Sequence, residues 1–185
     1  PSSPSIINLA PRIAVNYFPT NSAGIRIFNS WHDVFRWGTE MHDPQVTLDD
    51  SIAGKARELT ANSTTELDKI RAIANFVQNL QYISVDIGVG SGNGYRPRPA
   101  NLVLQRGYGD CKDKANLMRA MLKALKIESY PVFIYSGDPT YVKEEWSSPG
   151  QFNHCIIAIR VGSEVNLPSV ITHQTLGRLL IFDAT

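Results

Sequence analysis

The sequence is poor in charge and in long apolar runs, and each shortage excludes a class of protein. Charged residues make up 19% of the chain and nearly cancel, which leaves a net charge of +1. This balance argues against a broad surface for nucleic acid or membrane. No apolar stretch is long enough to span a bilayer, and no signal-peptide pattern is present. At 185 residues with 43% hydrophobic content, the chain suits one domain with a sizeable core.

Cysteine is also scarce, because Cys111 and Cys155 are the only two and cannot make a disulfide framework. No CxxC or HxxxH spacing occurs, so the sequence predicts neither a metal site nor a cofactor. The stretch GVGSGNG (88–94) lacks the Gly-Lys-Ser/Thr end of a phosphate-binding loop, and no helix is expected directly after it. We interpret this stretch as a mobile loop that borders a cleft.

The segment GYGDCKDKANLMRAMLKALK (107–126) places Cys111 at the start of an amphipathic helix. Asp110 is the predicted N-cap, Asp113 adds charge to the positive helix end, and Gly109 leaves the sulfur uncrowded. Apolar residues at helical spacing predict one buried face: Ala115, Met118, Met121, Leu122 and Leu125. Unpaired N–H groups and the helix dipole favour a thiolate in this first turn. Cys111 is therefore a candidate nucleophile; the alternative is a buried, unreactive cysteine.

A base and an acid follow on two apolar runs that are typical of strands. His154 begins HCIIAIRV, and Asp183 lies near the end of LLIFDAT. A buried carboxylate needs a partner, and an aspartate that accepts the Nδ1–H of His154 would leave Nε2 facing the thiol. The alternatives are a core histidine and an aspartate that caps a turn. The order Cys, His, Asp on helix, strand and strand favours a catalytic triad.

Strand alternation separates Cys155 from this group. Neighbouring residues of a strand point to opposite faces, so a geometry that directs His154 at Cys111 turns Cys155 away. The same alternation disfavours a disulfide and a shared zinc site. We expect Cys155 to be a buried, inert thiol.

Together, GYGDCKDKANLMRAMLKALKI, FNHCIIAI and LLIFDAT resemble the transglutaminase-like superfamily of cysteine enzymes, and more closely its bacterial branch. The R-P element in YRPRPANLVLQRG (95–107) also fits that branch. The resemblance implies an α+β, papain-like core in which N-terminal helices, including the nucleophile helix, pack on an antiparallel β-sheet. It also implies that Cys111 is the nucleophile, His154 the base and Asp183 the orienting acid.

The resemblance covers residues 28–185, which we interpret as the core, truncated at its C-terminus. Residues 1–27 are interpreted as a linker or strand segment from a preceding domain. Members of this branch are usually exported proteins in which the core follows a β-rich domain. We therefore expect a fused N-terminal β-rich domain and a periplasmic or otherwise extracytoplasmic location.

The first half of the core is predicted to be mainly helical. Helices are expected over 28–41 and from Asp49 or Asp50 to about Asn62. Ser63 and Glu66 then form an S-x-x-E capping box for a third helix. The alternating segment YISVDI (82–87) is a predicted strand.

Five further residues are candidates for the site. Related enzymes use a side chain upstream of the cysteine as a second oxyanion donor, and Gln81 or Tyr82 lies in that stretch. Tyr95 and Arg96 follow the glycine-rich loop and are candidate cleft residues, although Arg96 also suits a structural role. Trp146 is a possible substrate contact or a cover for the core.

Two classes of function remain open at this point. One is a cysteine enzyme that attacks peptide or protein amides through a thioester acyl-enzyme, with hydrolysis favoured over cross-linking. The other is a non-catalytic peptide-binding or structural module that keeps the fold. An intact set of Cys111, His154 and Asp183 favours the enzyme.

Overall fold

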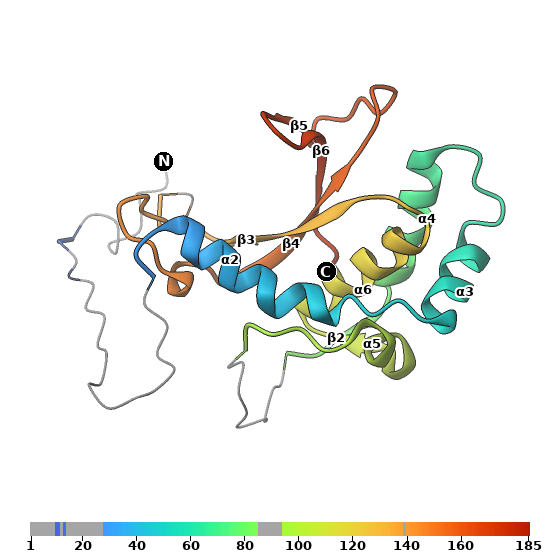
Figure 1. Ribbon diagram of the computed structural model, residues 1–185, viewed down its shortest axis with the longest axis horizontal. Coiled ribbons are helices and arrows are strands. Elements are labelled where there is room, and N and C mark those ends of the chain that lie inside the picture. The colour runs from blue at the N-terminus through green and yellow to red at the C-terminus, as the bar shows by residue number, and fades with distance from the viewer. Residues whose placement is uncertain (1–9, 12, 14–27, 85–93, 139) are drawn as a thin grey trace.

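The computed structural model of the chain describes residues 10, 11, 13, 28–84, 94–138 and 140–185. Most of the predicted linker at 1–27 lies outside the described residues, as do positions 88–93 of the glycine-rich loop and positions 85–87 of the predicted strand. The described part combines helices with an antiparallel sheet (Figure 1). This arrangement confirms the predicted mixed helix-and-sheet fold.

Helices dominate the first part of the chain and strands the second. The helical part contains α2 (Trp31–His42), η1 (Asp43–Gln45), α3 (Asp50–Leu59), α4 (Glu66–Gln78), β1 (Gln81–Tyr82), α5 (Ala100–Arg106), β2 (Tyr108–Gly109) and α6 (Cys111–Ala124). The strand part contains β3 (Ser129–Ile134), η2 (Pro149–Gln151), β4 (His154–Arg160), β5 (Val170–His173) and β6 (Gly177–Phe182). Within the described ranges, no helix has the length and apolarity needed to cross a membrane.

The main sheet is antiparallel, with strand order β3-β4-β6-β5. Its central strand β4 begins at His154, which pairs with Ile134 at the end of β3. On its other side β4 pairs with β6, and Ile157 lies opposite Phe182. Asp183 directly follows β6, so the ends of two neighbouring strands bring His154 and Asp183 to the same edge of the sheet.

Helix α6 packs against this sheet and is surrounded by α3, α4 and α5 (Figure 1). The sequence predicted one buried face, but α6 is buried on nearly all sides because helices cover the faces that the sheet does not. Its buried polar residues have partners: Lys114 Nζ donates to the carbonyls of Gln78 and Leu80, both at 3.2 Å, and Asn116 donates to the carbonyl of Gln45 at 2.7 Å. The lysine therefore caps the C-terminal end of α4.

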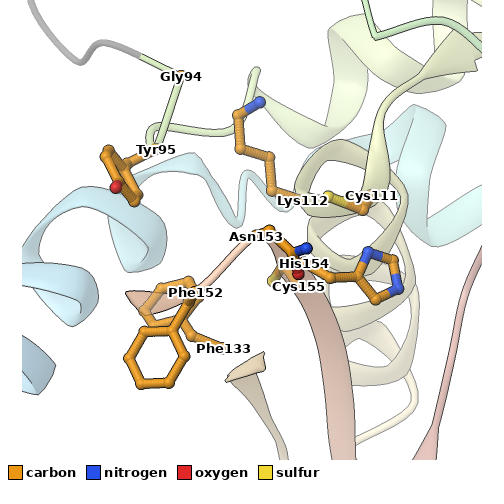
Figure 2. Close-up of a pocket in the computed structure, with 9 residues that line it drawn as sticks. All are labelled: Gly94, Tyr95, Cys111, Lys112, Phe133, Phe152, Asn153, His154 and Cys155. Carbon is orange, nitrogen blue, oxygen red and sulfur yellow. The ribbon is translucent and has the colours of Figure 1, made fainter. Parts of the chain in front are cut away.

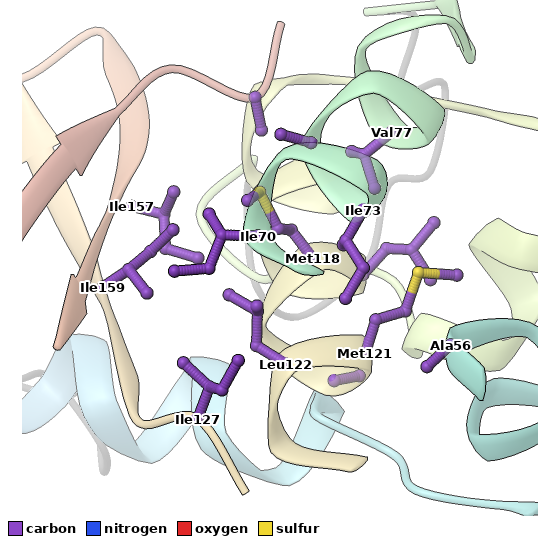
Figure 3. Packing of buried hydrophobic residues seen from close by; sticks show 14 of the residues in the cluster. Ala56, Ile70, Ile73, Val77, Met118, Met121, Leu122, Ile127, Ile157 and Ile159 are labelled. Atoms are coloured by element: carbon purple, nitrogen blue, oxygen red, sulfur yellow. The ribbon is translucent and has the colours of Figure 1, made fainter. Parts of the chain in front are cut away.

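The core lies between α6, α4 and the sheet (Figure 3). Ile70 and Ile73 of α4 meet Met118 and Leu122 of α6, and β4 adds Ile157 and Ile159, so that the helix layer and the sheet share one apolar cluster. The fully buried members of this cluster are Ile52, Ala56, Ile73, Val77, Ala100, Val103, Leu117, Met118, Ala120, Met121, Leu122, Ile157, Ile159 and Ala184. Burial of these side chains fixes α6 rigidly, and with it the position of Cys111.

Local capping residues set where α2, α3 and α4 begin. The predicted helix from Asp49 or Asp50 begins at Asp50, and Asp49 caps it by accepting a hydrogen bond from the backbone N–H of Ile52. The capping box of α4 is formed by Thr65 and Asp68, so the prediction of Ser63 and Glu66 was wrong. Thr65 has the extended backbone that an N-cap requires, and its hydroxyl and the Asp68 carboxylate bond each other's backbone N–H groups.

Helix α5 was not anticipated in the segment before Cys111. It starts after Pro99 and ends at Arg106, and Gly107 follows as its C-cap in a left-handed conformation with φ of 72°. The chain then forms β2, which pairs in parallel with β1 so that Tyr82 lies opposite Gly109. Of the described part of the predicted strand (82–84), only Tyr82 is in a strand, and β1 runs beside the residues that lead into Cys111.

Candidate active site

Cys111 is the first residue of α6, directly after the predicted N-cap. Asp110 has an extended backbone and accepts a hydrogen bond from the N–H of Asp113, while the Asp113 carboxylate accepts one from the N–H of Asp110. Gly109 is needed because a Cβ there would lie 2.6 Å from the Asp113 Cβ. The capping box and this close approach hold the first turn, and the thiol, in one orientation.

Asp113 also forms an ion pair with Arg98, a residue that was not predicted to be part of the site. The carboxylate is fully buried and accepts hydrogen bonds from the Arg98 guanidinium and, at 2.7 Å, from the Arg98 backbone N–H. Arg96, the arginine singled out from the sequence, is exposed and does not line the pocket. The two arginines of the RPRP element thus differ in burial and in partner, which the sequence alone did not resolve.

His154 and Asp183 are hydrogen-bonded, with 2.8 Å between His154 Nε2 and Asp183 Oδ2. The predicted bond from Asp183 to Nδ1 of His154 was wrong. The imidazole enters from the end of β4 with its Nε2 edge toward β6, so Nδ1 is the ring nitrogen left for Cys111. Figure 2 shows one ring nitrogen directed toward the side of the pocket where Cys111 lies.

Asp183 is held by three further hydrogen bonds. Its Oδ1 accepts from the N–H of Thr185 at 3.0 Å and from the Thr185 hydroxyl at 2.7 Å. Its backbone carbonyl accepts from Gln78 Nε2 at 3.0 Å. Burial raises the pKa of Asp183, but the hydrogen bonds from His154 and Thr185 outweigh it and leave the pKa below its ordinary value. The carboxylate is therefore ionised at neutral pH.

One pocket brings Cys111 and His154 together (Figure 2). Its volume is about 290 Å³, and its lining residues are Gly94, Tyr95, Cys111, Lys112, Phe133, Phe152, Asn153, His154 and Cys155. The structure therefore places all three predicted triad residues within one connected arrangement: a thiol and an imidazole on one pocket, and a carboxylate bonded to the far nitrogen of that imidazole.

Cys155 is buried and both cysteines are free, in agreement with the sequence analysis. Burial raises the pKa of Cys155 to about 12, so this thiol stays protonated at neutral pH. Strand alternation does not remove it from the pocket entirely, because Cys155 borders the inner wall. No group of three or more His, Cys, Asp or Glu side chains suited to a metal ion occurs within the described ranges.

The two candidate oxyanion donors differ in their surroundings. Burial raises the pKa of Tyr82, the Cys111 side chain raises it further, and hydrogen bonding to Ser84 and to the Cys111 backbone lowers it. Tyr82 is therefore a neighbour of Cys111. Gln81 is the preceding residue of the short strand β1, where successive side chains point to opposite faces. The structure thus brings Tyr82, and not Gln81, toward the thiol.

Of the remaining candidates, Tyr95 and Trp146, one lines the pocket and the other does not. Tyr95 lines the pocket, as expected. Trp146 is half-buried and is not among the residues that line it; its carbonyl accepts a hydrogen bond from Gln151 Nε2. Phe133 and Phe152 line the pocket but were not predicted. Phe152 lies two residues before His154, and this proximity is the signal that could have identified it.

A comparison with protein families matches residues 53–163 to the Transglutaminase-like superfamily. The match covers more than half of the chain, so the protein belongs to this superfamily, and the family predicted from its sequence is confirmed. A comparison with curated proteins gives no match.

Two solved structures are similar to the chain. One is a candidate protease from Parabacteroides distasonis, with a TM-score of 0.55 and 19% identity over 80% of this chain and 30% of that protein. The other is a candidate cysteine protease from Cytophaga hutchinsonii, with a TM-score of 0.46 and 19% identity over 77% of this chain and 41% of that protein. The chain thus spans less than half the length of either protein. Its fold is that of a transglutaminase-like cysteine enzyme.

Proposed function

We propose that the protein is a cysteine enzyme that attacks amide carbonyls of peptides or proteins through Cys111, His154 and Asp183. The observation that carries this proposal is the 2.8 Å bond between His154 Nε2 and Asp183 Oδ2, made by an imidazole that shares a pocket with a helix-start cysteine. A carboxylate on one ring nitrogen fixes the tautomer and leaves the other nitrogen to exchange a proton with the thiol.

The reaction begins with the thiolate of Cys111 and a protonated His154. The sulfur attacks the carbonyl carbon, the C–S bond forms, and the carbonyl electron pair moves onto oxygen. Collapse of this intermediate breaks the C–N bond, and the departing amine takes the proton from His154 Nδ1. Water then gives a proton to Nδ1 and attacks the thioester. The acid product leaves, and thiolate and imidazolium are restored.

The negative oxygen formed during each attack needs donors. The backbone N–H of Cys111 is one: it has no partner within the helix, and the oxyanion would replace the Tyr82 oxygen that this N–H now bonds. We assign the Tyr82 hydroxyl as the second, because Tyr82 is a neighbour of both the Cys111 side chain and its backbone. Loss of one such donor typically lowers kcat about 10²-fold to 10³-fold.

Hydrolysis is the outcome we favour over cross-linking, and a non-catalytic peptide-binding module is the alternative function. A fused β-rich N-terminal domain and an extracytoplasmic location belong to the same proposal, and both rest on the family resemblance. The preference for hydrolysis over cross-linking is based on bacterial members of the superfamily that carry this cysteine motif.

Incubation with an unfolded protein substrate, a fluorescent primary amine and water enriched in ¹⁸O separates these outcomes. Peptide-bond cleavage with ¹⁸O in the new carboxylates supports proteolysis, a glutamine-to-glutamate mass change supports deamidation, and incorporated amine supports cross-linking. Each signal is expected to disappear in Cys111→Ala. A substrate that stays unchanged with the native protein, or changes equally with Cys111→Ala, would contradict the enzyme assignment.

A further inference from the structure

Aromatic side chains line the part of the pocket that the proposed chemistry does not use. Tyr95 follows the glycine-rich loop, Phe133 belongs to β3, and Phe152 precedes β4. Figure 2 shows these three rings on one side of the pocket, with Cys111 and His154 on the other. We call Tyr95, Phe133 and Phe152 the aromatic wall.

The aromatic wall is held from behind by α2. His42 packs edge-on against Phe133 with ring centroids 5.1 Å apart, and its Nε2 is 3.0 Å from the carbonyl of Tyr95. Trp37 packs edge-on against Tyr95 at 5.1 Å. Burial lowers the pKa of His42 to about 4, so this support carries no charge at neutral pH. The wall is therefore both apolar and fixed in place.

Gly38 of α2 determines how closely the Phe133 ring of the aromatic wall packs against this helix. A Cβ at this position would be 2.6 Å from Phe133 Cε2, closer than side chains can approach. The glycine therefore lets the Phe133 ring lie directly against α2. An alanine at 38 would displace the ring from this position and change the shape of the wall.

The charge and size of the pocket also favour an apolar occupant. None of its described lining residues carries a carboxylate, and the ammonium of Lys112 is ion-paired with Asp110. The volume of about 290 Å³ exceeds the ~150 Å³ apolar cavity that is known to hold benzene. One aromatic side chain and part of a peptide backbone would fit.

We propose that the aromatic wall is a substrate subsite that binds a large apolar side chain, preferably an aromatic one, next to the amide attacked by Cys111. The proposal rests on the proposed function, since it names the class of peptide that this site would take. It adds Tyr95, Phe133 and Phe152 as the residues that determine specificity, and Gly38 as the residue that positions the wall.

Binding is measured in Cys111→Ala, which cannot react, by titrating it with N-acetyl-phenylalaninamide, N-acetyl-alaninamide and N-acetyl-glutamate amide. Aromatic side-chain NMR signals of the wall report the site. We expect the phenylalanine compound to bind at least about tenfold more tightly than either of the others, because a hydrophobic pocket separates side chains by this factor or more. Equal affinities, or shifts away from the wall, would overturn the proposal.

Two glycines of the helices provide matched variants. Gly38→Ala is expected to remove most of the preference for phenylalanine, whereas Gly54→Ala in α3, where an added Cβ meets nothing within 4 Å, should leave the preference intact. Should Gly38→Ala fail to fold, Phe152→Lys at a half-buried position replaces it. That variant is expected to prefer the glutamate compound, and an unchanged preference would contradict the subsite.

The native protein separates this proposal from the proposed function. Its Cys111 is labelled with iodoacetamide and with peptidyl chloromethyl ketones that carry phenylalanine, alanine or glutamate. Rapid labelling by iodoacetamide with equal rates for the three ketones would refute the subsite alone. Slow labelling by every reagent, together with selective binding of phenylalaninamide to Cys111→Ala, would refute the catalytic assignment and leave the subsite standing.

Discussion

Replacing Arg98 with alanine is expected to destabilise the protein through the carboxylate that it leaves behind. Asp113 is fully buried and Arg98 is about a quarter exposed. Removing one partner of a buried ion pair typically costs about 3–5 kcal/mol. Two backbone donors to Asp113 remain, from Arg98 itself and from Asp110, and partial exposure screens the pair. We therefore expect a loss of about 2–3 kcal/mol.

Arg96→Ala is the matched control, because Arg96 lies two residues away in the same RPRP element and is exposed. It should change the stability by no more than about 0.5 kcal/mol. Urea unfolding followed by circular dichroism measures both variants, and Arg98→Ala should also lower Tm by about 4–12 °C for a chain of this length. Equal stabilities of the two variants would refute the claim that the Arg98–Asp113 pair holds the start of α6.

Three further predictions concern the site and its support. Because burial lowers the pKa of His42 to about 4, below the unfolded value of about 6.5, the unfolded chain binds more protons between these values. The free energy of unfolding should therefore fall by roughly 3 kcal/mol as pH drops from 6.5 to 4, and it should fall less in His42→Gln. Urea unfolding at several pH values measures both, and a stability that does not change with pH would contradict this prediction. In steady-state assays, Tyr82→Phe should lower kcat about 10²-fold with little change in KM, while Gln81→Ala should keep kcat within about twofold of the native value. The reverse result would make Gln81, and not Tyr82, the second oxyanion donor. Lys114→Met keeps the buried aliphatic stem but leaves the carbonyls at the end of α4 without the lysine donor. Urea unfolding should therefore show a decrease of about 1–3 kcal/mol in the free energy of unfolding, and an unchanged value would argue against the capping role of Lys114.

The sequence predicted the start of α6 well because local chemistry decides it. An aspartate N-cap, an acidic residue three positions later and a glycine before them act within one turn, and Asp110, Asp113 and Gly109 are placed as expected. The strand positions of His154 and Asp183 were also accessible, since a β-branched run marks β4 and an apolar run marks β6. Their meeting at 2.8 Å follows from strand pairing.

What the sequence could not determine depends on long-range packing. The imidazole nitrogen that meets Asp183 is set by how β4 and β6 align, and the expected Nδ1 contact was wrong for that reason. The choice of Arg98 over Arg96 depends on which of the two residues the fold brings against Asp113 of α6. The aromatic wall is assembled from three distant segments, so Phe133 could not be recognised before the fold was known, whereas Phe152 had only its proximity to His154 as a signal.

The pH dependence of Cys111 alkylation by iodoacetamide, followed by mass spectrometry, tests the central claim most directly. Cys155 is an internal control, since it is buried with its pKa raised to about 12 and should stay unlabelled. An ordinary thiol of pKa ~8.5 is only about 0.3% ionised at pH 6. The triad predicts rapid labelling of Cys111 at pH 6 that is lost in His154→Ala. Labelling that rises about tenfold per pH unit up to pH 8.5, and is unchanged in His154→Ala, would contradict it.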